Sequence, residues 1–263
     1  CPMIPSTMRD RLRHAARAAA VTVFWIAVWE GLSRLIGEEL LLPSPGTVAA
    51  EWLRLCTTVS FWTAAALSLL RVLGGFAAAL LCGSLLAMLT SRFRILRVLL
   101  APLLHVVRAA PVASFIILAL VWIRSGLLPL FISFLMVVPL VWDAVEQGIR
   151  QTDPALLEMA RAYRLSRGQI FRHIRFPSVL PYLLTAMTTG VGFAWKSAVA
   201  AEVICRPAHS IGDYLYAAKM YLETPAVFAW TATAVLLSVG LTALLRRLTA
   251  SLRRRYTPEK EAA

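Results

Sequence analysis

The sequence predicts an all-α integral membrane protein with six transmembrane helices and with both termini in the cytoplasm. Hydrophobic residues make up 59% of its 263 residues, and the mean hydropathy is +0.70. Six separate apolar segments are each about 20 residues long, which is the length that an α-helix needs to cross a bilayer. Nineteen of the 27 Lys and Arg residues fall in segments that this topology places on one side of the membrane. The positive-inside rule assigns that side to the cytoplasm.

The first two predicted spans are joined by a turn and a short helix. Arginines in residues 1–17 precede the first span and predict a cytoplasmic tail. After this span, the sequence Pro43-Ser44-Pro45-Gly46 predicts a turn, and we expect Thr47 to cap a short helix along the outer interface. In the second span, Gly74-Gly75 and Gly83-Ser84 permit close approach by another helix.

The remaining four spans complete a single predicted domain. We expect the third span to be broken at Pro102 and Pro111, because proline removes a helical hydrogen bond. Between the last two spans, SIGDYLYAAKMYLETPAVFAW predicts an external amphipathic segment. Residues 248–263 form a predicted basic cytoplasmic tail. The six spans are expected at about residues 18–36, 64–89, 99–122, 127–145, 182–204 and 227–245.

One polar segment, Asp153–Pro181, interrupts the apolar chain between the fourth and fifth spans. Asp153-Pro154 is a typical helix start, because the carboxylate accepts hydrogen bonds from free N–H groups and the proline ring fixes a helical φ. Leu156, Ala160 and Tyr163 then recur at i, i+4 and i+7, which predicts an apolar stripe on a short helix. A helix this short needs packing against a partner to be stable.

A second short helix is predicted within the same segment. Ser166 and Gln169 have the spacing of a capping box, and Phe176-Pro177 is expected to end the helix. A basic amphipathic loop beside a membrane is the simpler interpretation, but the spacing of the motifs is more specific than that. Six arginines of this region face one predicted compartment: Arg150, Arg161, Arg164, Arg167, Arg172 and Arg175.

The segment resembles the EAA loop of binding-protein-dependent ABC importer permeases. That motif has Glu, two Ala, a Gly four residues after the second Ala, and an Ile-x-Leu-Pro ending. Glu158, Ala160, Ile174 and Pro177 stand at matching positions. Three positions depart from the motif: Met159 stands for the first Ala, Phe176 for the Leu, and Arg164 for the Gly.

The departure at Arg164 concerns the turn between the two short helices. In the family, the glycine permits that turn, whereas an arginine at positive φ costs about 1 kcal/mol or more. Two alternatives stay open from the sequence. Either the turn is built elsewhere, through Gly168, or Arg164 has a strained backbone.

Further segments resemble the nitrate/sulfonate/taurine branch of this family, and the resemblance covers about residues 42–247. They include the LPSP turn, HVVRAAPVASFIILALVWIRSG, and the spacing from Trp195 to Glu202 with Ala-Ala-Glu. The resemblance implies a permease with a transmembrane core at about residues 60–247. It also implies a small anionic or polar nutrient, such as a sulfonate, nitrate, taurine or a pyrimidine-type vitamin precursor.

The resemblance also implies partners in the bacterial cytoplasmic membrane. They are two ATPase subunits, a periplasmic or lipid-anchored solute-binding protein, and a second permease chain, with a homodimer favoured over a heterodimer. In this interpretation the first short helix docks on the ATPase, with Leu156, Ala160 and Tyr163 buried, and with Glu158 and Arg161 at the rim.

Charged residues within predicted spans are candidates for a solute pathway, because they are expensive to bury in a bilayer. Arg108, Lys196 and Glu202 are the charged candidates, and Pro111 and Trp195 lie beside them in the sequence. An equally good account is that each charged side chain reaches the membrane surface or pairs with another helix. Arg71, close to a span end, is expected to reach the surface.

The sequence contains no G-x(4)-G-K-[ST] phosphate loop, no catalytic constellation and no metal-ligand spacing. ATP and Mg²⁺ are therefore expected to be used by a partner, and this chain is not expected to be an enzyme. The charge of +13 lies beside apolar segments and lacks a nucleic-acid motif, so it indicates contact with membrane lipid rather than nucleic acid. Cys56 and Cys205 fall in predicted external loops, which leaves a disulfide between them possible.

The N-terminus predicts a retained tail rather than a cleaved leader. The first apolar segment is not followed by a small-x-small cleavage site. Because the chain begins with Cys1, we expect translation to start at Met3, at Met8 or upstream.

Two other classes of membrane protein were weighed against the permease. A six-span intramembrane serine protease would use Ser84 and His105 as its dyad, but the G-x-S-G context is missing. A secondary transporter would show two repeats with broken helices in matching places, and none is evident. The single polar loop favours the ATP-driven importer.

Overall fold

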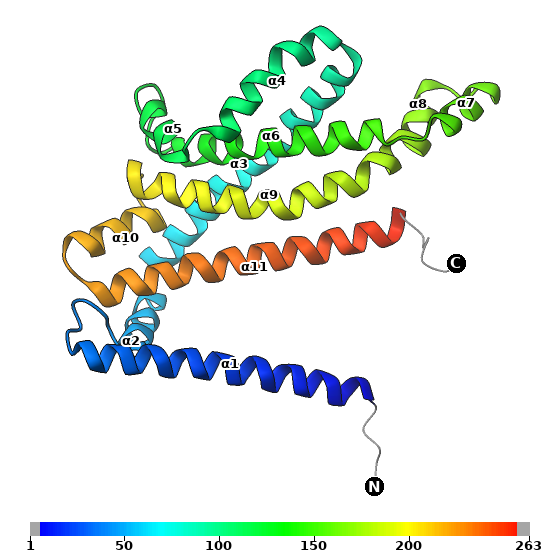
Figure 1. The fold of residues 1–263 in the computed structure, drawn as a ribbon. Helices are drawn as coiled ribbons and strands as arrows, with labels where there is room; N and C mark the ends of the chain where they lie inside the picture. The colour runs from blue at the N-terminus through cyan, green and yellow to red at the C-terminus, as the bar shows by residue number, and fades with distance from the viewer. Residues whose placement is uncertain (1–5, 257–263) are drawn as a thin grey trace. The chain divides into compact units, whose positions relative to one another are not determined.

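The computed structural model describes the backbone of residues 6–256 and the side chains of residues 17 and 19–252. All regular elements in that part of the chain are helices, so the predicted all-α class is confirmed. The expected start at Met3 and the extreme ends of both predicted tails lie outside the described residues. The elements, drawn in Figure 1, are α1 (Ser6–Ile36), α2 (Pro45–Cys56), α3 (Val59–Arg92), α4 (Arg94–Ala109), α5 (Val112–Ala119), α6 (Leu128–Arg150), α7 (Pro154–Ala162), α8 (Arg167–Ile170), the π-helix η1 (Phe171–Arg175), α9 (Phe176–Cys205), α10 (Ile211–Met220) and α11 (Thr224–Tyr256).

Within the described residues, four helices are long and apolar enough to cross a membrane: α1, α3, α6 and α11. The pair α4 and α5 makes a fifth span if it is counted as one, although its two helices are bent by 106°. The break lies at Pro111, as predicted, whereas Pro102 lies inside α4 and does not break it. The fifth predicted span corresponds to the 30-residue α9, which is not among the described helices that qualify as spans by length and composition.

By internal contacts, the chain divides into two compact units. The first unit comprises residues 1–61 and 215–232. Here Trp29 donates from Nε1 to the carbonyl oxygen of Pro43 at 3.1 Å and stacks on Phe228. The N-cap of α2 is Ser44, which accepts from the Thr47 N–H at 3.1 Å, so the expectation that Thr47 caps this helix is wrong. Pro45 follows Ser44 at the first helical position, which explains why the helix begins one turn earlier than a cap at Thr47 would imply.

The second unit, residues 62–214 and 233–263, contains α3 to α9 and the polar segment. In this unit α6 and α9 run side by side (Figure 1). The predicted close approach at the glycines of α3 is confirmed. A Cβ added to Gly83 would lie only 2.9 Å from Cβ of Val141 on α6, so no larger residue fits without a shift. Two hydrogen bonds join the same helices: Ser133 Oγ to the Val72 carbonyl, and Trp142 Nε1 to Thr90 Oγ1.

Candidate functional site

The segment Asp153–Arg175, here called the coupling loop after the role that its resemblance implies, begins with the predicted cap. The Asp153 carboxylate accepts a hydrogen bond from the Ala155 N–H at 2.8 Å, and Pro154 opens α7. The capping box of α8 is also confirmed. Ser166 Oγ accepts from the Gln169 N–H at 3.3 Å, and the Gln169 side chain accepts from the Ser166 N–H at 2.8 Å. The loop therefore contains two short helices where the sequence predicted them.

The turn between the two helices is built at Arg164, not at Gly168. Arg164 has φ of 53°, in the left-handed region. The Leu165 N–H donates to the Ala160 carbonyl at 2.9 Å, and the Arg164 N–H donates to the Arg161 carbonyl at 3.0 Å. These two bonds form the Schellman arrangement that usually ends in glycine. Arginine thus occupies the position at which the family motif has glycine, with the backbone that glycine would adopt.

The end of the loop differs from the prediction. Phe176-Pro177 does not stop a helix, because the chain passes from α8 through the π-helical turn η1 directly into α9. The Phe176 N–H donates to the Phe171 carbonyl, five residues back. A wider turn at this point suits a proline that follows, since Pro177 cannot donate a backbone hydrogen bond.

The coupling loop presents a mixed apolar and basic surface. Leu156 and Met159 of α7 and its C-cap Tyr163 are 42%, 49% and 77% exposed, and they recur at i, i+3 and i+7. Ala160 is completely buried within its own chain, so it is already covered before any partner docks. The reversal at Arg164 returns the backbone to Ala160 and accounts for this burial.

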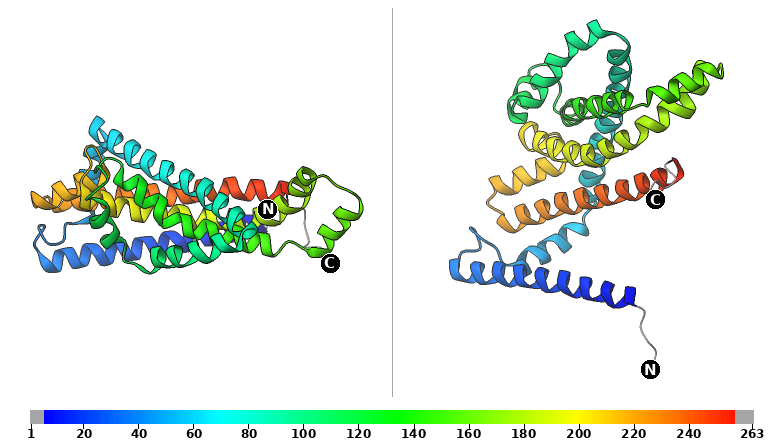
Figure 2. Two further views of the ribbon diagram at one scale, coloured as in Figure 1. Left: turned by 90° about the horizontal axis from the view of Figure 1, so that it is seen from above. Right: turned by 45° about the vertical axis from the view of Figure 1, so that its right-hand side comes forward.

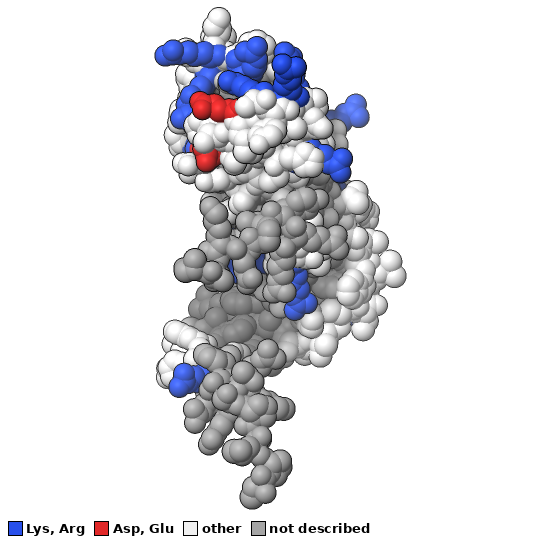
Figure 3. All heavy atoms as spheres, turned by 90° about the vertical axis from the view of Figure 1, so that its right-hand side faces the viewer, with Lys and Arg blue, Asp and Glu red and all other residues white. Residues whose placement is uncertain are grey.

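Lys and Arg atoms gather over this end of the second unit (Figure 3), and the loop projects beyond α6 and α9 in both views of Figure 2. Its exposed arginines are Arg161, Arg164, Arg167, Arg172 and Arg175.

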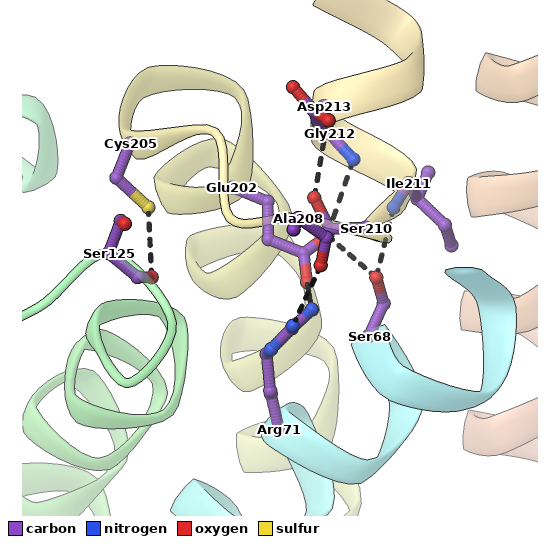
Figure 4. Close-up of polar contacts among 10 residues, drawn as sticks. All are labelled: Ser68, Arg71, Ser125, Glu202, Cys205, Ala208, Ser210, Ile211, Gly212 and Asp213. Carbon is purple, nitrogen blue, oxygen red and sulfur yellow. Dashed lines mark hydrogen bonds and ion pairs between the residues drawn. The ribbon is translucent and has the colours of Figure 1, made fainter. Parts of the chain in front are cut away.

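The buried carboxylate Glu202 is the centre of a second polar group, here called the Glu202 cluster (Figure 4). Its side chain is fully buried, and Oε2 accepts from Ser68 Oγ at 2.8 Å and from the Gly212 N–H at 3.3 Å. Arg71 pairs with Oε1 at 3.3 Å and also donates to the Ala208 carbonyl. The cluster therefore joins α3, the end of α9 and the start of α10.

The Glu202 cluster shows that one expectation is wrong, and it contains two residues that the sequence did not point to. Arg71 does not extend to a membrane surface, since its side chain is 15% exposed and bound to Glu202. Ser68 and Gly212 were not singled out from the sequence. Ser68 lies three residues before Arg71, on the same helical face, and that spacing was the available signal. Gly212 leaves no room for a Cβ, because one would collide with the backbone of Glu202 and Val203.

The other pathway candidates lie apart from this cluster. Arg108 forms an ion pair with Asp143 on α6 and donates from Nη2 to the Pro139 carbonyl at 2.6 Å. Pro111 is the N-cap of α5, at the bend. Trp195 is buried, whereas the neighbouring Lys196 is exposed. Cys205 is not in a disulfide, and its thiol donates to the Ser125 carbonyl at 3.5 Å.

A family match, similar sequences and similar solved structures all indicate the same kind of protein. Residues 75–258 match the family described as "Binding-protein-dependent transport system inner membrane component". The taurine transport system permease protein TauC of Escherichia coli is 29% identical over 93% of this chain and 91% of its own. The nitrate import permease protein NrtB of a Synechocystis species is 28% identical over 72% of this chain and 71% of its own.

Solved structures support the fold. An amino acid ABC transporter crystallised with histidines has a TM-score of 0.61 at 15% identity, covering 74% of this chain and 94% of that one. A bacterial alginate ABC transporter, in complex with a periplasmic protein bound to an alginate pentasaccharide, has a TM-score of 0.57 over 95% and 96%. Neither comparison supports a secondary transporter or a protease. The chain belongs to the binding-protein-dependent transport system inner membrane components, the transmembrane permease subunits of ABC importers.

Proposed function

We propose that this permease carries a small anionic or zwitterionic nutrient across the bacterial inner membrane. The named solutes of its relatives are taurine, nitrate and bicarbonate, each of which bears an anionic group. Lys196 supports this choice, because it is an exposed cation within the long helix α9. A cation in a membrane segment is a functional candidate by default. The observation that carries the proposal is this charge on α9.

The proposed topology has six spans, with α9 as the fifth and with both termini in the cytoplasm. The transmembrane core is proposed at about residues 60–247, within one permease domain that also includes the tails 1–17 and 248–263. The coupling loop then lies in the cytoplasm, as its exposed arginines favour. Two copies of the chain would form one pathway, supplied by a periplasmic or lipid-anchored binding protein.

Coupling to ATP is proposed to act through α7. Its exposed stripe of Leu156, Met159 and Tyr163 suits a groove on an ATPase subunit, with Glu158 and Arg161 beside it. Two such subunits would bind ATP and Mg²⁺ between them. Movement of a docked α7 would reach α9 through the helical turns from Ser166 to Pro177, which include Ile174 and have no intervening loop.

The first experiment tests docking. Met159→Asp places a carboxylate on the exposed stripe, and we expect loss of transport together with loss of the ATPase from the purified complex. The charge must be desolvated on docking, which opposes binding by several kcal/mol. Transport in proteoliposomes and ATPase co-purification are measured side by side.

Met159→Leu is the matched control for the docking test, since it keeps an apolar side chain of similar volume. We expect it to retain both activities. Full transport by Met159→Asp with the ATPase still bound would exclude this stripe as the docking surface.

The second experiment tests the charge of the solute. Lys196→Gln removes the cation, and we expect at least a tenfold lower rate of uptake for the solute of the associated binding protein, whereas Lys196→Arg keeps much of it. Taurine, nitrate and bicarbonate are the solutes to compare. Equal uptake by both variants would remove Lys196 from the pathway.

A further inference from the structure

A basic cavity lies where the end of α3, the start of α4 and the end of α6 meet. Its volume is about 410 Å³, and four arginines line it against one glutamate. None of these residues belongs to the coupling loop or to the Glu202 cluster. The lining consists of Thr90, Ser91, Arg92, Arg94, Arg97, Glu146, Ile149 and Arg150.

The positive charge of this cavity is only partly neutralised by the chain. Glu146 is 6% exposed, and its Oε1 pairs with Arg97 at 3.1 Å and with Arg150 at 3.0 Å. Arg92 and Arg94 pair with no carboxylate in the described part of the chain. Four cations against one anion leave a net charge of three, concentrated around a concave surface. Guanidinium groups in that arrangement suit a phosphate, which accepts paired hydrogen bonds from them.

The helix that carries Arg94 and Arg97 has a second, apolar face. Polar residues of α4 recur at Arg94, Arg97, His105 and Arg108. The opposite face leaves large apolar side chains exposed by more than half, and an exposed apolar face of this kind suits contact with lipid acyl chains. These side chains are Ile95, Val98, Leu99, Leu103 and Val106.

A separate apolar cavity lies further along the same helices and shares no lining residue with the basic one. It has a volume of about 440 Å³ and is lined by apolar side chains of α3 to α6 and of the turn that follows α5. On α3, Leu86 of this cavity lies one turn before Thr90 of the basic cavity. On α4, Leu100 follows Arg97 by three residues, about 4.5 Å along the axis. The molecule thus places a site for a phosphate next to a site for a hydrocarbon chain.

We propose that these two cavities together bind an anionic phospholipid, with the headgroup phosphate among Arg92, Arg94 and Arg97 and one acyl chain in the apolar cavity. A free phosphate would use the arginines but would leave the apolar cavity empty. Basic pockets between membrane helices are known to hold anionic headgroups for this reason. The bound lipid would fix α4 against α6 at the bend before α5.

The test uses the full chain purified from membranes in detergent. Phosphatidylglycerol retained by the protein is measured by mass spectrometry after washing with phosphatidylcholine. Arg92→Gln combined with Arg94→Gln removes two cations that pair with no acidic side chain, so the fold is expected to persist. Each arginine near a lipid surface changes binding about fivefold, so we expect about thirtyfold weaker retention for the pair.

Arg246→Gln combined with Arg247→Gln is the matched control, because it removes two exposed cations from α11. We expect this variant to retain phosphatidylglycerol as the unmodified chain does. Equal loss in both variants would overturn the proposal in favour of nonspecific charge attraction. Unchanged retention in the Arg92/Arg94 variant would overturn it as well.

A second measurement on the unmodified chain distinguishes a lipid from a free phosphate and needs no variant. Glycerol phosphate and short-chain phosphatidylglycerol are compared as competitors at equal concentration. We expect competition from the lipid alone. Equal competition by glycerol phosphate would show a site for soluble phosphates and would overturn the lipid assignment.

Discussion

The coupling loop and the Glu202 cluster are both polar parts of an apolar chain, and they are held together in opposite ways. In the loop, the bonds that define the backbone join residues two to five positions apart, such as Asp153 with Ala155 and Leu165 with Ala160. In the cluster, the bonds that tie α3 to the end of α9 and the turn after it join residues 131 to 137 positions apart, as between Arg71 and Glu202. The loop is a local structure with an exposed surface, whereas the cluster is a long-range tie with a buried centre.

This difference indicates separate tasks for the two regions. A locally ordered loop keeps its shape while it moves as a body, which suits a surface that docks and follows a partner. A buried ion pair with three further hydrogen bonds loses much of its stability if any member moves away. The Glu202 cluster therefore fixes α3 to the end of α9 and the start of α10.

The largest expected difference between the regions comes from removing one glutamate from each. Glu202→Leu leaves Arg71, Ser68 and the Gly212 N–H without their buried acceptor, and we expect a loss of about 3–5 kcal/mol in the free energy of unfolding. The exposed Glu158→Leu in the loop should change it by less than about 0.5 kcal/mol. Thermal unfolding of the two purified variants is the measurement. Similar losses would show that the cluster is not a stronger tie than the loop.

A smaller difference is expected from adding one methyl group to a glycine in each region. Gly212→Ala forces a Cβ against the backbone of Glu202 and Val203, and we expect about 1–3 kcal/mol of destabilisation. Gly168→Ala has open space around its Cβ and lies in α8, so it should be neutral or stabilising by up to about 1 kcal/mol. The same unfolding measurement applies. An unaffected Gly212→Ala would mean that the α9–α10 connection is loosely packed.

The smallest expected effect concerns the two arginines that have left-handed backbones. Arg164→Gly relieves the strain at φ 53° and should stabilise the loop by about 0.5–1 kcal/mol, seen as slower hydrogen exchange at the Leu165 amide. Arg206→Gly, at φ 48°, relieves similar strain but loses the ion pair with Asp213, so little net change is expected. Faster exchange at Leu165 in Arg164→Gly would show that the arginine side chain itself stabilises the turn.

The same contrast explains what could be predicted from the sequence. The caps at Asp153 and Ser166 depend on residues within one helical turn, and both were predicted correctly. The sequence could not decide whether the turn lies at Arg164 or at Gly168, because a turn at either residue fits the spacing between the two helices. The burial of Ala160 within the single chain was not predicted, since an apolar stripe does not show which of its residues packs against the rest of the same chain.

Only part of the Glu202 cluster could be predicted from the sequence. Glu202 was identified as a charge that is expensive to bury, but its pairing with Arg71 depends on how α3 packs beside α9. No short spacing encodes that contact, and Arg71 was therefore expected to reach the membrane surface. The Gly83 contact was predicted because a small residue in a span indicates close packing whatever the partner is.

The π-helical turn before α9 sets the direction in which α7 points. A π turn holds one residue more than an α-helical turn, and each residue of an α-helix corresponds to a rotation of about 100°. Deleting one residue from Phe171–Arg175 would convert this turn to α-helix and rotate the exposed stripe of α7 by about that angle around the axis of α9. The exposed stripe would then face a different direction around that axis, although every residue in it was intact. The direction in which α7 faces therefore depends on the five residues of η1, even if none of them contacts a partner.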